Sequence, residues 1–544
     1  MKVIILRDKN KKNKSGKIKS RSTKTNSTRT RDTGYRTTDS RYQDRSGDTG
    51  MYPPYTARPD QTGKKPSKKK SRKKQRRAST GKEYVIIAYL CVGMFLSLIG
   101  YMVYFNVKLK DDVISSPYNR RQDTYAEHVV RGEIQASGGE VLAKTETDSE
   151  GNETRVYPYG RVFAHAVGYD SNGRGGIELS KNSQLLSSHA FVLEQVENGL
   201  KDQKNQGDNV ITTLDAKLQQ VAYDALGNNK GAVVAMEPDT GRVLALVSKP
   251  DFDPNTLAAD WEAMVSDETN SSLVNRATQG LYPPGSTFKI VTALAYLRDK
   301  GSFDGFSYNC TGTLPAGEYT LHCYNNTVHG QEDFATAFAK SCNTAFAEIG
   351  MATSLSTFQE TAEDLLFNKD LSLGDMLSNK SSFTLDKNAG KPLTMQTSIG
   401  QGNTLVTPMH MAMIVSAVAN DGKVMKPYLV DEIQSYTGSR VKKYSPKTYD
   451  TLMTPEEADA LSALMQQVTA TGTAKSLSGS GYTVAGKTGS AEHGGSDIPH
   501  SWFVGFSNVE DPDLVVSVIS EGSGTGSEVA VPIAKKIFDA YHAG

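Results

Sequence analysis

Three short groups of residues in the C-terminal two-thirds of this 544-residue chain have the types and spacing needed for acyl transfer. They are Ser286-Thr287-Phe288-Lys289, Ser341-Cys342-Asn343 and Lys487-Thr488-Gly489. A serine hydroxyl becomes a nucleophile when a base takes its proton, and a lysine amine is a base only when it is neutral. Each group alone is weak evidence, because Ser67-Lys68-Lys69-Lys70 repeats the first pattern inside a basic segment. The order of the three groups along the chain and the local context of each together predict a site for acyl transfer.

The first serine stands where a turn meets an expected helix. Tyr282-Pro283-Pro284-Gly285 is a turn signal, and residues 289–297 form an apolar-rich run of helical length. This predicts that Ser286 lies in the first helical turn and that Lys289, three residues later, lies on the same face. Burial, the positive end of the helix dipole and Lys487 as a second cation would all lower the pKa of Lys289.

The third group is expected at the end of a short strand. Residues 482–486 read as a strand that leads into Lys487-Thr488-Gly489-Ser490, and residues 502–506 read as a second strand. Gly489 would let a substrate backbone approach closely. The hydroxyls and the ammonium group suit the terminal carboxylate of a peptide. The backbone N–H groups of Ser286 and Ser490 would form an oxyanion hole.

The ordered motifs resemble the active site of class B penicillin-binding proteins, which are monofunctional peptidoglycan D,D-transpeptidases. The resemblance covers residues 208–544 and includes a hairpin-like stretch over 231–246 and Gly400-Gln401-Gly402. Upstream, Arg131-Gly132-Glu133-Ile134 resembles the membrane-proximal pedestal of the family. There is one departure in the pedestal, because residues 135–140 replace the usual Asp-Arg-x-Gly-like continuation. Another is Cys342, where many relatives carry a different small residue.

The resemblance implies an α/β fold with four parts. A penicillin-binding transpeptidase domain of serine β-lactamase-like fold would have a mostly antiparallel sheet flanked by helices, with the site between the sheet edge and a helical subdomain. The helix after Ser286 would cross the core, and a helix over 531–541 would pack on the sheet. The expected parts are a disordered basic cytoplasmic tail (1–83), a transmembrane helix (84–107), an elongated pedestal that resembles a dimerisation domain (108–207) and the transpeptidase domain (208–544).

Charge and hydropathy support the N-terminal part of this division. Residues 1–83 hold 27 Lys or Arg and 7 Asp or Glu, whereas residues 84–544 hold 35 and 53. Residues 84–107 are a long apolar run whose length as a helix, roughly 36 Å, is enough to cross a bilayer. The basic cluster at 64–77 directly precedes this run, so the positive-inside rule predicts a cytoplasmic N-terminus and an extracytoplasmic catalytic domain. Attraction of the tail to anionic lipid is favoured over nucleic-acid binding.

The resemblance also implies a reaction and partners. Ser286, with Lys289 as base, would attack a peptidoglycan stem peptide and form an acyl-enzyme, and β-lactams would acylate the same serine and inhibit the enzyme. Ser341 and Lys487 would relay the proton to the leaving D-Ala, and Asn343 would hydrogen-bond the donor backbone. Thr488 and Ser490 would receive the carboxylate. No cofactor is expected. Too few residues separate 107 from 208 for a glycan polymerase, so a SEDS-type membrane glycosyltransferase is the expected partner.

Three other functions remain open at the level of the sequence. A D,D-carboxypeptidase uses the same acylation chemistry, with water as the acceptor. A class A β-lactamase needs a glutamate that activates water, and the nearest candidate, Glu363, stands in Glu363-Asp364-Leu365-Leu366-Phe367-Asn368, which lacks the usual Glu-x-x-Leu-Asn arrangement. A non-catalytic cell-wall scaffold is disfavoured because the motif serines, lysines and asparagine are all present.

Four cysteines complete the set of reactive residues. Cys91 lies in the apolar run and Cys342 in the second motif, while Cys310 and Cys323 flank a short segment with Gly312, Pro315 and Gly317. Outside the membrane Cys310 and Cys323 could form a disulfide, and the alternative is two free thiols. No Cys/His spacing suggests a zinc site. His329 is expected to have a structural role in the turn at Gly330.

Overall fold

The computed structural model describes residues 81–105, 126–267, 269–494 and 496–544. Helix α1 (Gly81–Tyr104) begins three residues before the predicted transmembrane run and ends three residues before its predicted end. Among the described residues it is the one helix long and apolar enough to cross a membrane. The basic tail lies outside the described residues up to position 80, and so does the start of the predicted pedestal up to position 125.

A five-stranded antiparallel sheet is the centre of the C-terminal part, as the resemblance implied. Its order is β17-β18-β19-β7-β8, so strand β17, which carries the third motif, is an edge strand. The strands are β7 (Gly231–Met236), β8 (Val243–Lys249), β17 (Val484–His493), β18 (Ser496–Ser507) and β19 (Val515–Ser520). Strand β17 begins two residues after the predicted start and continues through the whole motif.

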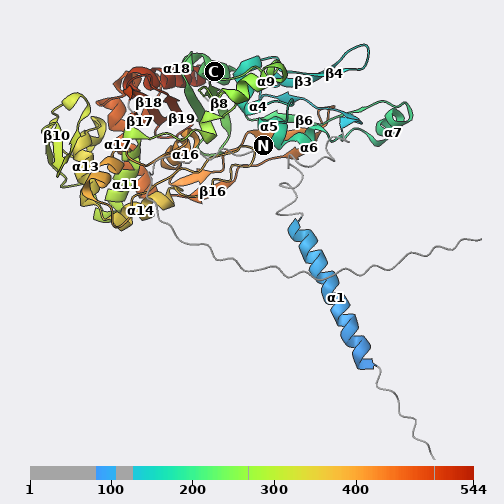
Figure 1. Ribbon diagram of the computed structural model, residues 1–544, viewed down its shortest axis with the longest axis horizontal. Helices are drawn as coiled ribbons and strands as arrows, with labels where there is room; N and C mark the ends of the chain where they lie inside the picture. The colour runs from blue at the N-terminus through green and yellow to red at the C-terminus, as the bar shows by residue number, and fades with distance from the viewer. Residues whose placement is uncertain (1–80, 106–125, 268, 495) are drawn as a thin grey trace, which may run out of the picture. The chain divides into compact units, whose positions relative to one another are not determined.

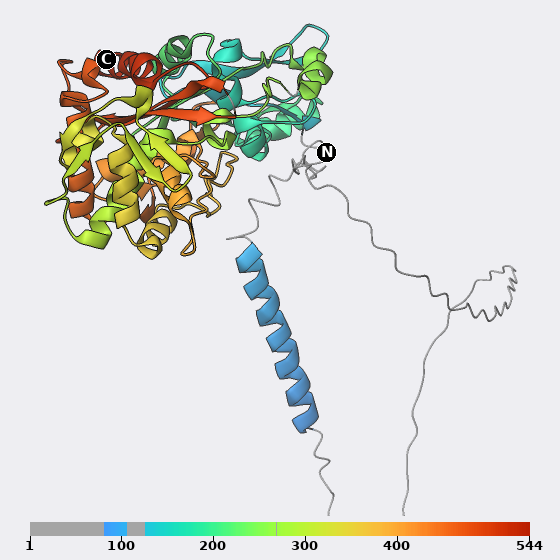
Figure 2. The ribbon, with the colours of Figure 1, turned by 60° about the vertical axis from the view of Figure 1, so that its left-hand side comes forward.

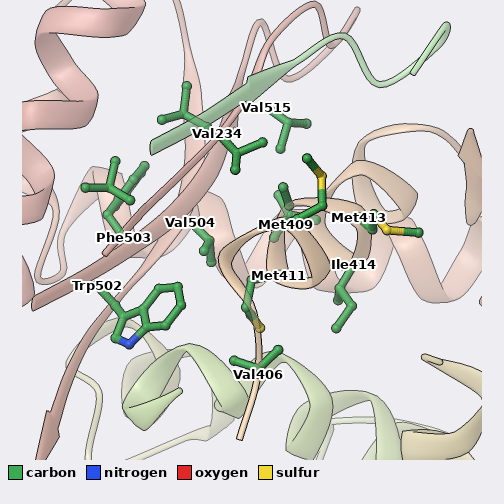
Figure 3. Close-up of a cluster of buried hydrophobic side chains, with 14 of the residues drawn as sticks. Val234, Val406, Met409, Met411, Met413, Ile414, Trp502, Phe503, Val504 and Val515 are labelled. Carbon is green, nitrogen blue, oxygen red and sulfur yellow. The ribbon is translucent and has the colours of Figure 1, made fainter. Parts of the chain in front are cut away.

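Helices cover both faces of this sheet. Helix α18 (Val531–His542) lies above the sheet and α16 (Pro408–Ala419) lies below it (Figure 1). Helix α8 (Ala216–Leu226) packs on α18 and on strands β7 and β8. Every residue of α16 is buried, which explains a helix that is apolar on all sides. Figure 3 shows this packing, with Met409 of α16 beside Val504 and Val515 of the sheet. The predicted packing of the C-terminal helix on the sheet is confirmed.

A set of helices borders the edge strand β17 (Figure 2). Helix α17 packs on β17, on α12 and on α11, while α11 also packs on α13 and α14. The first eight residues of α11 are buried, which confirms that the helix after Ser286 crosses the core. The helices are α11 (Lys289–Lys300), α12 (Phe334–Ala339), α13 (Asn343–Ala352), α14 (Leu355–Asp364), α15 (Lys391–Ser398) and α17 (Pro455–Ala470).

Two small strand pairs lie between α11 and α12 in the sequence. Strands β10 (Thr313–Ala316) and β11 (Tyr319–His322) form an antiparallel hairpin. Strands β9 (Tyr308–Cys310) and β12 (Gly330–Glu332) pair antiparallel on either side of it. This nesting brings both ends of the segment 308–332 together, close to the second motif.

The expected boundary at residue 208 falls inside a shared sheet. The six-stranded order β15-β14-β6-β2-β3-β4 joins strands from before and after this position. The two parts of the chain therefore share one hydrogen-bonded layer, because strands of the pedestal pair with strands that come from far down the chain. The boundary at residue 208 stays a prediction. The members are β2 (Ile134–Gln135), β3 (Val141–Thr147), β4 (Glu153–Val156), β6 (Asn209–Thr212), β14 (Val430–Gln434) and β15 (Arg440–Lys443).

The pedestal has a buried ionic centre beside this sheet. The carboxylate of Glu178 in α5 (Gly176–Ser180) is fully buried and accepts hydrogen bonds from Arg131 and Arg155. The two guanidinium groups lower the pKa of Glu178 against the effect of burial. Removing this carboxylate would leave two largely buried guanidinium groups without their shared partner, which is strongly destabilising.

Candidate active site

The Ser286 turn is held against the edge of the five-stranded sheet. Ser286 lies in a 3₁₀ turn, η3 (Gly285–Phe288), which runs directly into α11, so the predicted helix-terminal position is confirmed. Gly285 has a φ of +53°, and a Cβ at this position would lie 3.1 Å from the Ser490 carbonyl oxygen. The indole of Trp502 donates a hydrogen bond of 3.1 Å to the Pro283 carbonyl. Only glycine fits at position 285 without strain, because the backbone there has a positive φ and lies close to Ser490.

Lys289 is buried one turn after the serine and is bound to the second motif. Its Nζ atom lies 2.7 Å from the Ser341 carbonyl oxygen, 3.2 Å from Ser341 Oγ and 2.9 Å from Asn343 Oδ1. Burial lowers the pKa of Lys289 to about 8, partly offset by the charges of Cys342, Cys323 and Glu332. No hydrogen bond joins the half-buried Ser286 hydroxyl to another described residue.

The second motif forms the turn between α12 and α13. Ser341 has a φ of +59°, a backbone conformation that is uncommon for residues other than glycine. Cys342 is the N-cap of α13, and its Sγ atom accepts a hydrogen bond of 3.5 Å from the Ala345 N–H. The Asn343 amide donates a hydrogen bond of 3.1 Å to the His322 carbonyl, so both ends of this amide are held.

Lys487 reaches the same serine from the edge strand. Its Nζ atom donates to Ser341 Oγ at 2.9 Å and to the Thr488 carbonyl at 3.1 Å. Burial first, and the positive charge of Lys289 second, hold the pKa of Lys487 well below its usual value. Ser341 Oγ therefore lies between two fully buried amines, a position from which a hydroxyl can pass a proton.

The remaining residues of the third motif have partners within the protein, and their role in receiving a carboxylate stays a prediction. Thr488 Oγ1 lies 2.6 Å from Thr473 Oγ1, and Ser490 Oγ accepts a hydrogen bond of 3.2 Å from the Gly526 N–H. A Cβ on Gly489 would lie 3.1 Å from the Pro284 carbonyl oxygen. Gly489 is thus required by the turn that carries Ser286, rather than only by a substrate. Thr473 is a site residue that the sequence did not indicate.

The β-lactamase candidate Glu363 does not have the surroundings of a water-activating base. Its side chain lies on α14 and accepts a hydrogen bond of 2.9 Å from Gln359 on the same helix. Oxyanion donation by the Ser286 and Ser490 N–H groups stays a prediction, although the contact between Gly285 and Ser490 brings the two segments together.

A cluster of three thiols and one imidazole lies directly behind the second motif. Cys310, Cys323, His329 and Cys342 offer ligand atoms that all lie within 4.8 Å of one another, and such a group could hold a metal ion. The three cysteines are free in the structure, with Cys310 and Cys323 Sγ atoms 3.7 Å apart, and the predicted disulfide stays a prediction. Hydrogen bonding to Cys342 lowers the pKa of Cys323 to about 4, and the same contact raises that of Cys342.

The family of the chain follows from comparison with known proteins. A family model described as the penicillin binding protein transpeptidase domain matches residues 231–539, more than half of the chain. The chain belongs to this family. A second model, the penicillin binding protein A dimerisation domain, matches residues 131–210 and covers much of the predicted pedestal.

Mycobacterial members of the transpeptidase family are similar over most of their length. The peptidoglycan D,D-transpeptidase PbpA of Mycolicibacterium smegmatis is 33% identical over 78% of this chain and 91% of its own length. PbpA of Mycobacterium tuberculosis is 31% identical over 79% and 92%. The structure of penicillin-binding protein A from M. tuberculosis as an imipenem acyl-enzyme complex has a TM-score of 0.71 and 30% identity, and covers 77% of this chain and 100% of that chain.

Proposed function

We propose that this chain is a serine-type peptidoglycan D,D-transpeptidase that cross-links stem peptides through an acyl-enzyme on Ser286. One observation supports this most strongly. Ser341 Oγ lies 2.9 Å and 3.2 Å from the two buried lysine amines, and one of these lysines follows Ser286 by a single turn. Relatives bear the name D,D-transpeptidase, and a similar solved structure is an acyl-enzyme with a β-lactam.

The geometry supports the following sequence of steps. Neutral Lys289 takes the Ser286 proton as the hydroxyl attacks the carbonyl carbon of the penultimate D-Ala, while backbone N–H groups at the sheet edge hold the developing oxyanion. The C–N bond breaks, and the proton passes through Ser341, held by Lys487, to the leaving D-Ala amine. An amine of a second stem peptide then attacks the ester and frees Ser286. β-Lactams acylate Ser286 by the same first step.

The second candidate, a D,D-carboxypeptidase, differs only in the acceptor. Full-length protein, purified in detergent, would be given newly made uncross-linked glycan strands, and the muropeptides would be separated by mass. Cross-linked dimers are expected for the transpeptidase. Monomers shortened by one D-Ala, with no dimers, would favour the carboxypeptidase. The absence of both products, in an assay in which a known transpeptidase forms dimers, would contradict enzymatic function. The non-catalytic scaffold would then be the favoured hypothesis.

The rate of penicillin acylation is expected to rise with pH through about 8. The base is the neutral amine of Lys289, whose pKa is lowered to about 8 by burial. Below this pH the amine keeps its proton, so only about one molecule in ten is active at pH 7. Rapid-mixing measurements of acylation from about pH 6 to about pH 10 check this. A rate that falls as pH rises through this range would contradict the assignment of the base.

We also infer that α1 anchors the protein in the cell membrane with the N-terminus in the cytoplasm. The helix is fully exposed along its length and has the composition of a membrane span. The basic cluster at residues 64–77 precedes it. The catalytic residues would then lie outside, where stem peptides are. Cysteine-accessibility labelling of intact cells, using one added cysteine on each side of α1, tests the orientation.

The pedestal carries an apolar surface that suits the expected SEDS-type polymerase. Helix α7 (Val192–Leu200) exposes a stripe made of Val192, Leu193, Val196 and Leu200, and Phe191 precedes it; these side chains are 55% to 84% exposed. On the opposite side, Glu194 accepts a hydrogen bond of 2.6 Å from Tyr436. We call the five apolar residues the α7 stripe. Exposed apolar clusters of this kind mark binding surfaces.

A membrane protein fits the α7 stripe better than a second copy or the bilayer does. A nine-residue helix offers far less area than the roughly 1,200 Å² that a stable dimer buries. The acidic side chains Glu194 and Glu197 beside the stripe disfavour an anionic lipid surface. A polymerase could bind α1 within the membrane and the α7 stripe outside it, and two linked contacts strengthen each other.

Charge on the α7 stripe is expected to weaken association with the polymerase by about tenfold or more. The variant is L193E/V196E in the full chain, co-expressed with a SEDS-type polymerase and captured in detergent. Leu377→Glu, at another exposed leucine, is the matched control and should bind normally. Penicillin labelling should be equal in all three proteins. Normal capture of the variant would contradict this surface, and loss of self-association instead would assign it to a second copy.

A further inference from the structure

The thiol–imidazole cluster has the dimensions of a tetrahedral zinc site. Zinc–sulfur bonds of about 2.3 Å at tetrahedral angles place two sulfurs about 3.8 Å apart. The observed Sγ–Sγ distances are 3.7 Å between Cys310 and Cys323 and 3.8 Å between Cys323 and Cys342. The fourth ligand atom, His329 Nδ1, lies 3.4 Å from Cys310 Sγ.

Groups around the cluster donate hydrogen bonds to the sulfurs. The Gly312 N–H donates to Cys310 at 3.4 Å, and the Ala345 N–H donates to Cys342 at 3.5 Å. The Thr344 hydroxyl donates to Cys310 at 3.2 Å and lies 3.5 Å from both other sulfurs. Outer-shell donors of this kind stabilise thiolates and orient them toward a metal.

The buried carboxylate of Glu332 ends strand β12, whose first residue pairs with Cys310 of β9. Glu332 is 2% exposed, and neither of its oxygens has a hydrogen-bond partner among the described residues. The carboxylate lies 3.9 Å from Lys340 Nζ, and its charge also acts on Lys289. A buried carboxylate without a hydrogen bond is costly, and a nearby dication would offset part of that cost.

We propose that Cys310, Cys323, His329 and Cys342 bind one zinc ion, and that this ion positions Ser341 and Asn343. Three thiolates and an imidazole are ligands that zinc prefers, and four protein ligands leave no position open for substrate. The role is therefore structural. The ion would join the ends of the 308–332 segment to the turn between α12 and α13.

The positioning role follows from where the ligands stand in the chain. Cys342 separates Ser341 from Asn343, so a metal bond at Cys342 restrains both neighbours. Ser341 has a φ of +59°, which needs support from its surroundings. Cys323 follows His322, whose carbonyl accepts the Asn343 amide at 3.1 Å. Loss of the ion would release both groups, and small misplacements of this kind cost about 100-fold in rate.

The first experiment measures metal independently of activity. Full-length protein is purified in detergent without chelators, and its metals are counted by plasma mass spectrometry. One zinc per chain is expected in the wild type and in Cys91→Ser, which removes the cysteine of α1. Cys323→Ser and His329→Ala should lose it, and His329→Cys, which makes a four-cysteine site, should keep it. A second test needs no variant: wild-type protein loaded with cobalt in place of zinc should show thiolate-to-cobalt charge-transfer absorption.

The outcomes separate this proposal from the proposed function, on which only the positioning role rests. Substoichiometric metal in the wild type, with Cys310 and Cys323 linked or all three thiols alkylated, overturns the zinc site. If His329→Ala loses zinc, keeps its thermal unfolding transition and slows penicillin labelling about 100-fold, with His329→Cys restoring the rate, the positioning role is supported. Unchanged labelling in folded, zinc-free protein overturns that role. Wild type that binds zinc but never labels overturns the proposed function alone.

Discussion

Replacing Ser286 with alanine is expected to abolish covalent labelling by a fluorescent penicillin while the protein stays folded. The acyl bond forms at the oxygen of Ser286, which stands one turn before Lys289, and the amines of Lys289 and Lys487 both contact Ser341 Oγ. The hydroxyl is half-buried and forms no hydrogen bond to another described residue, so its removal should change stability by no more than about 0.5 kcal/mol. Gel fluorescence and a thermal unfolding curve of the full chain measure the two effects.

A matched variant separates nucleophile from proton relay. Ser341→Ala removes a hydroxyl that touches both lysines but leaves Ser286 in place. We expect this variant to label slowly, with the adduct still on Ser286, whereas Ser286→Ala yields none. Peptide mapping by mass spectrometry of the wild-type adduct locates the bond. An adduct on any other residue would show that the nucleophile has been misassigned.

The sequence was sufficient where local pattern and resemblance agreed. The run at 289–297 predicted a helix, and α11 occupies Lys289–Lys300 because its first two turns are buried on all sides. The strand at the third motif was predicted, although it starts at Val484 and runs longer, since nine of its ten residues pair with β18. Pairing partners, rather than propensity, set the ends of a strand.

Contacts between distant segments were not predictable from spacing. Thr473 lies opposite Thr488 because α17 returns the chain to the edge strand, and no local signal marks that return. The ligands of the proposed zinc site could not be recognised in the sequence for a related reason. Their positions, 310, 323, 329 and 342, include no closely spaced cysteine pair. Only the nesting of the β10–β11 hairpin inside the β9–β12 pair brings them within 4.8 Å.

The shared sheet shows why domain limits are difficult to read from a sequence. The predicted boundary at position 208 is the point where the resemblance to the transpeptidase domain begins. Strand β6 follows it directly, yet pairs in parallel with β2 of the pedestal and antiparallel with β14. A cut at this position would divide one hydrogen-bonded layer. The pedestal therefore depends on strands supplied by the catalytic part. A structural change in one part can be transmitted to the other through this shared sheet.

Replacing Lys289 with arginine is expected to slow acylation almost as much as replacing it with alanine, by about 1,000-fold or more. Arginine keeps its charge at any accessible pH, so it cannot take the Ser286 proton. The native amine is buried, and burial lowers its pKa to about 8, which makes the neutral form available. Stopped-flow measurement of penicillin acylation on the full chain gives the rates.

Two further variants of α11 make this result decisive. Lys289→Met has a similar volume and no charge, so it should fold at least as well as the wild type and still fail to acylate. Lys300→Arg changes the same residue type at the exposed end of the helix, where it pairs with Asp299, and should acylate normally. A folded Lys289→Met protein with a near-normal rate would show that another group activates Ser286. Lys487, which is also buried and reaches Ser341, would then become the base to test.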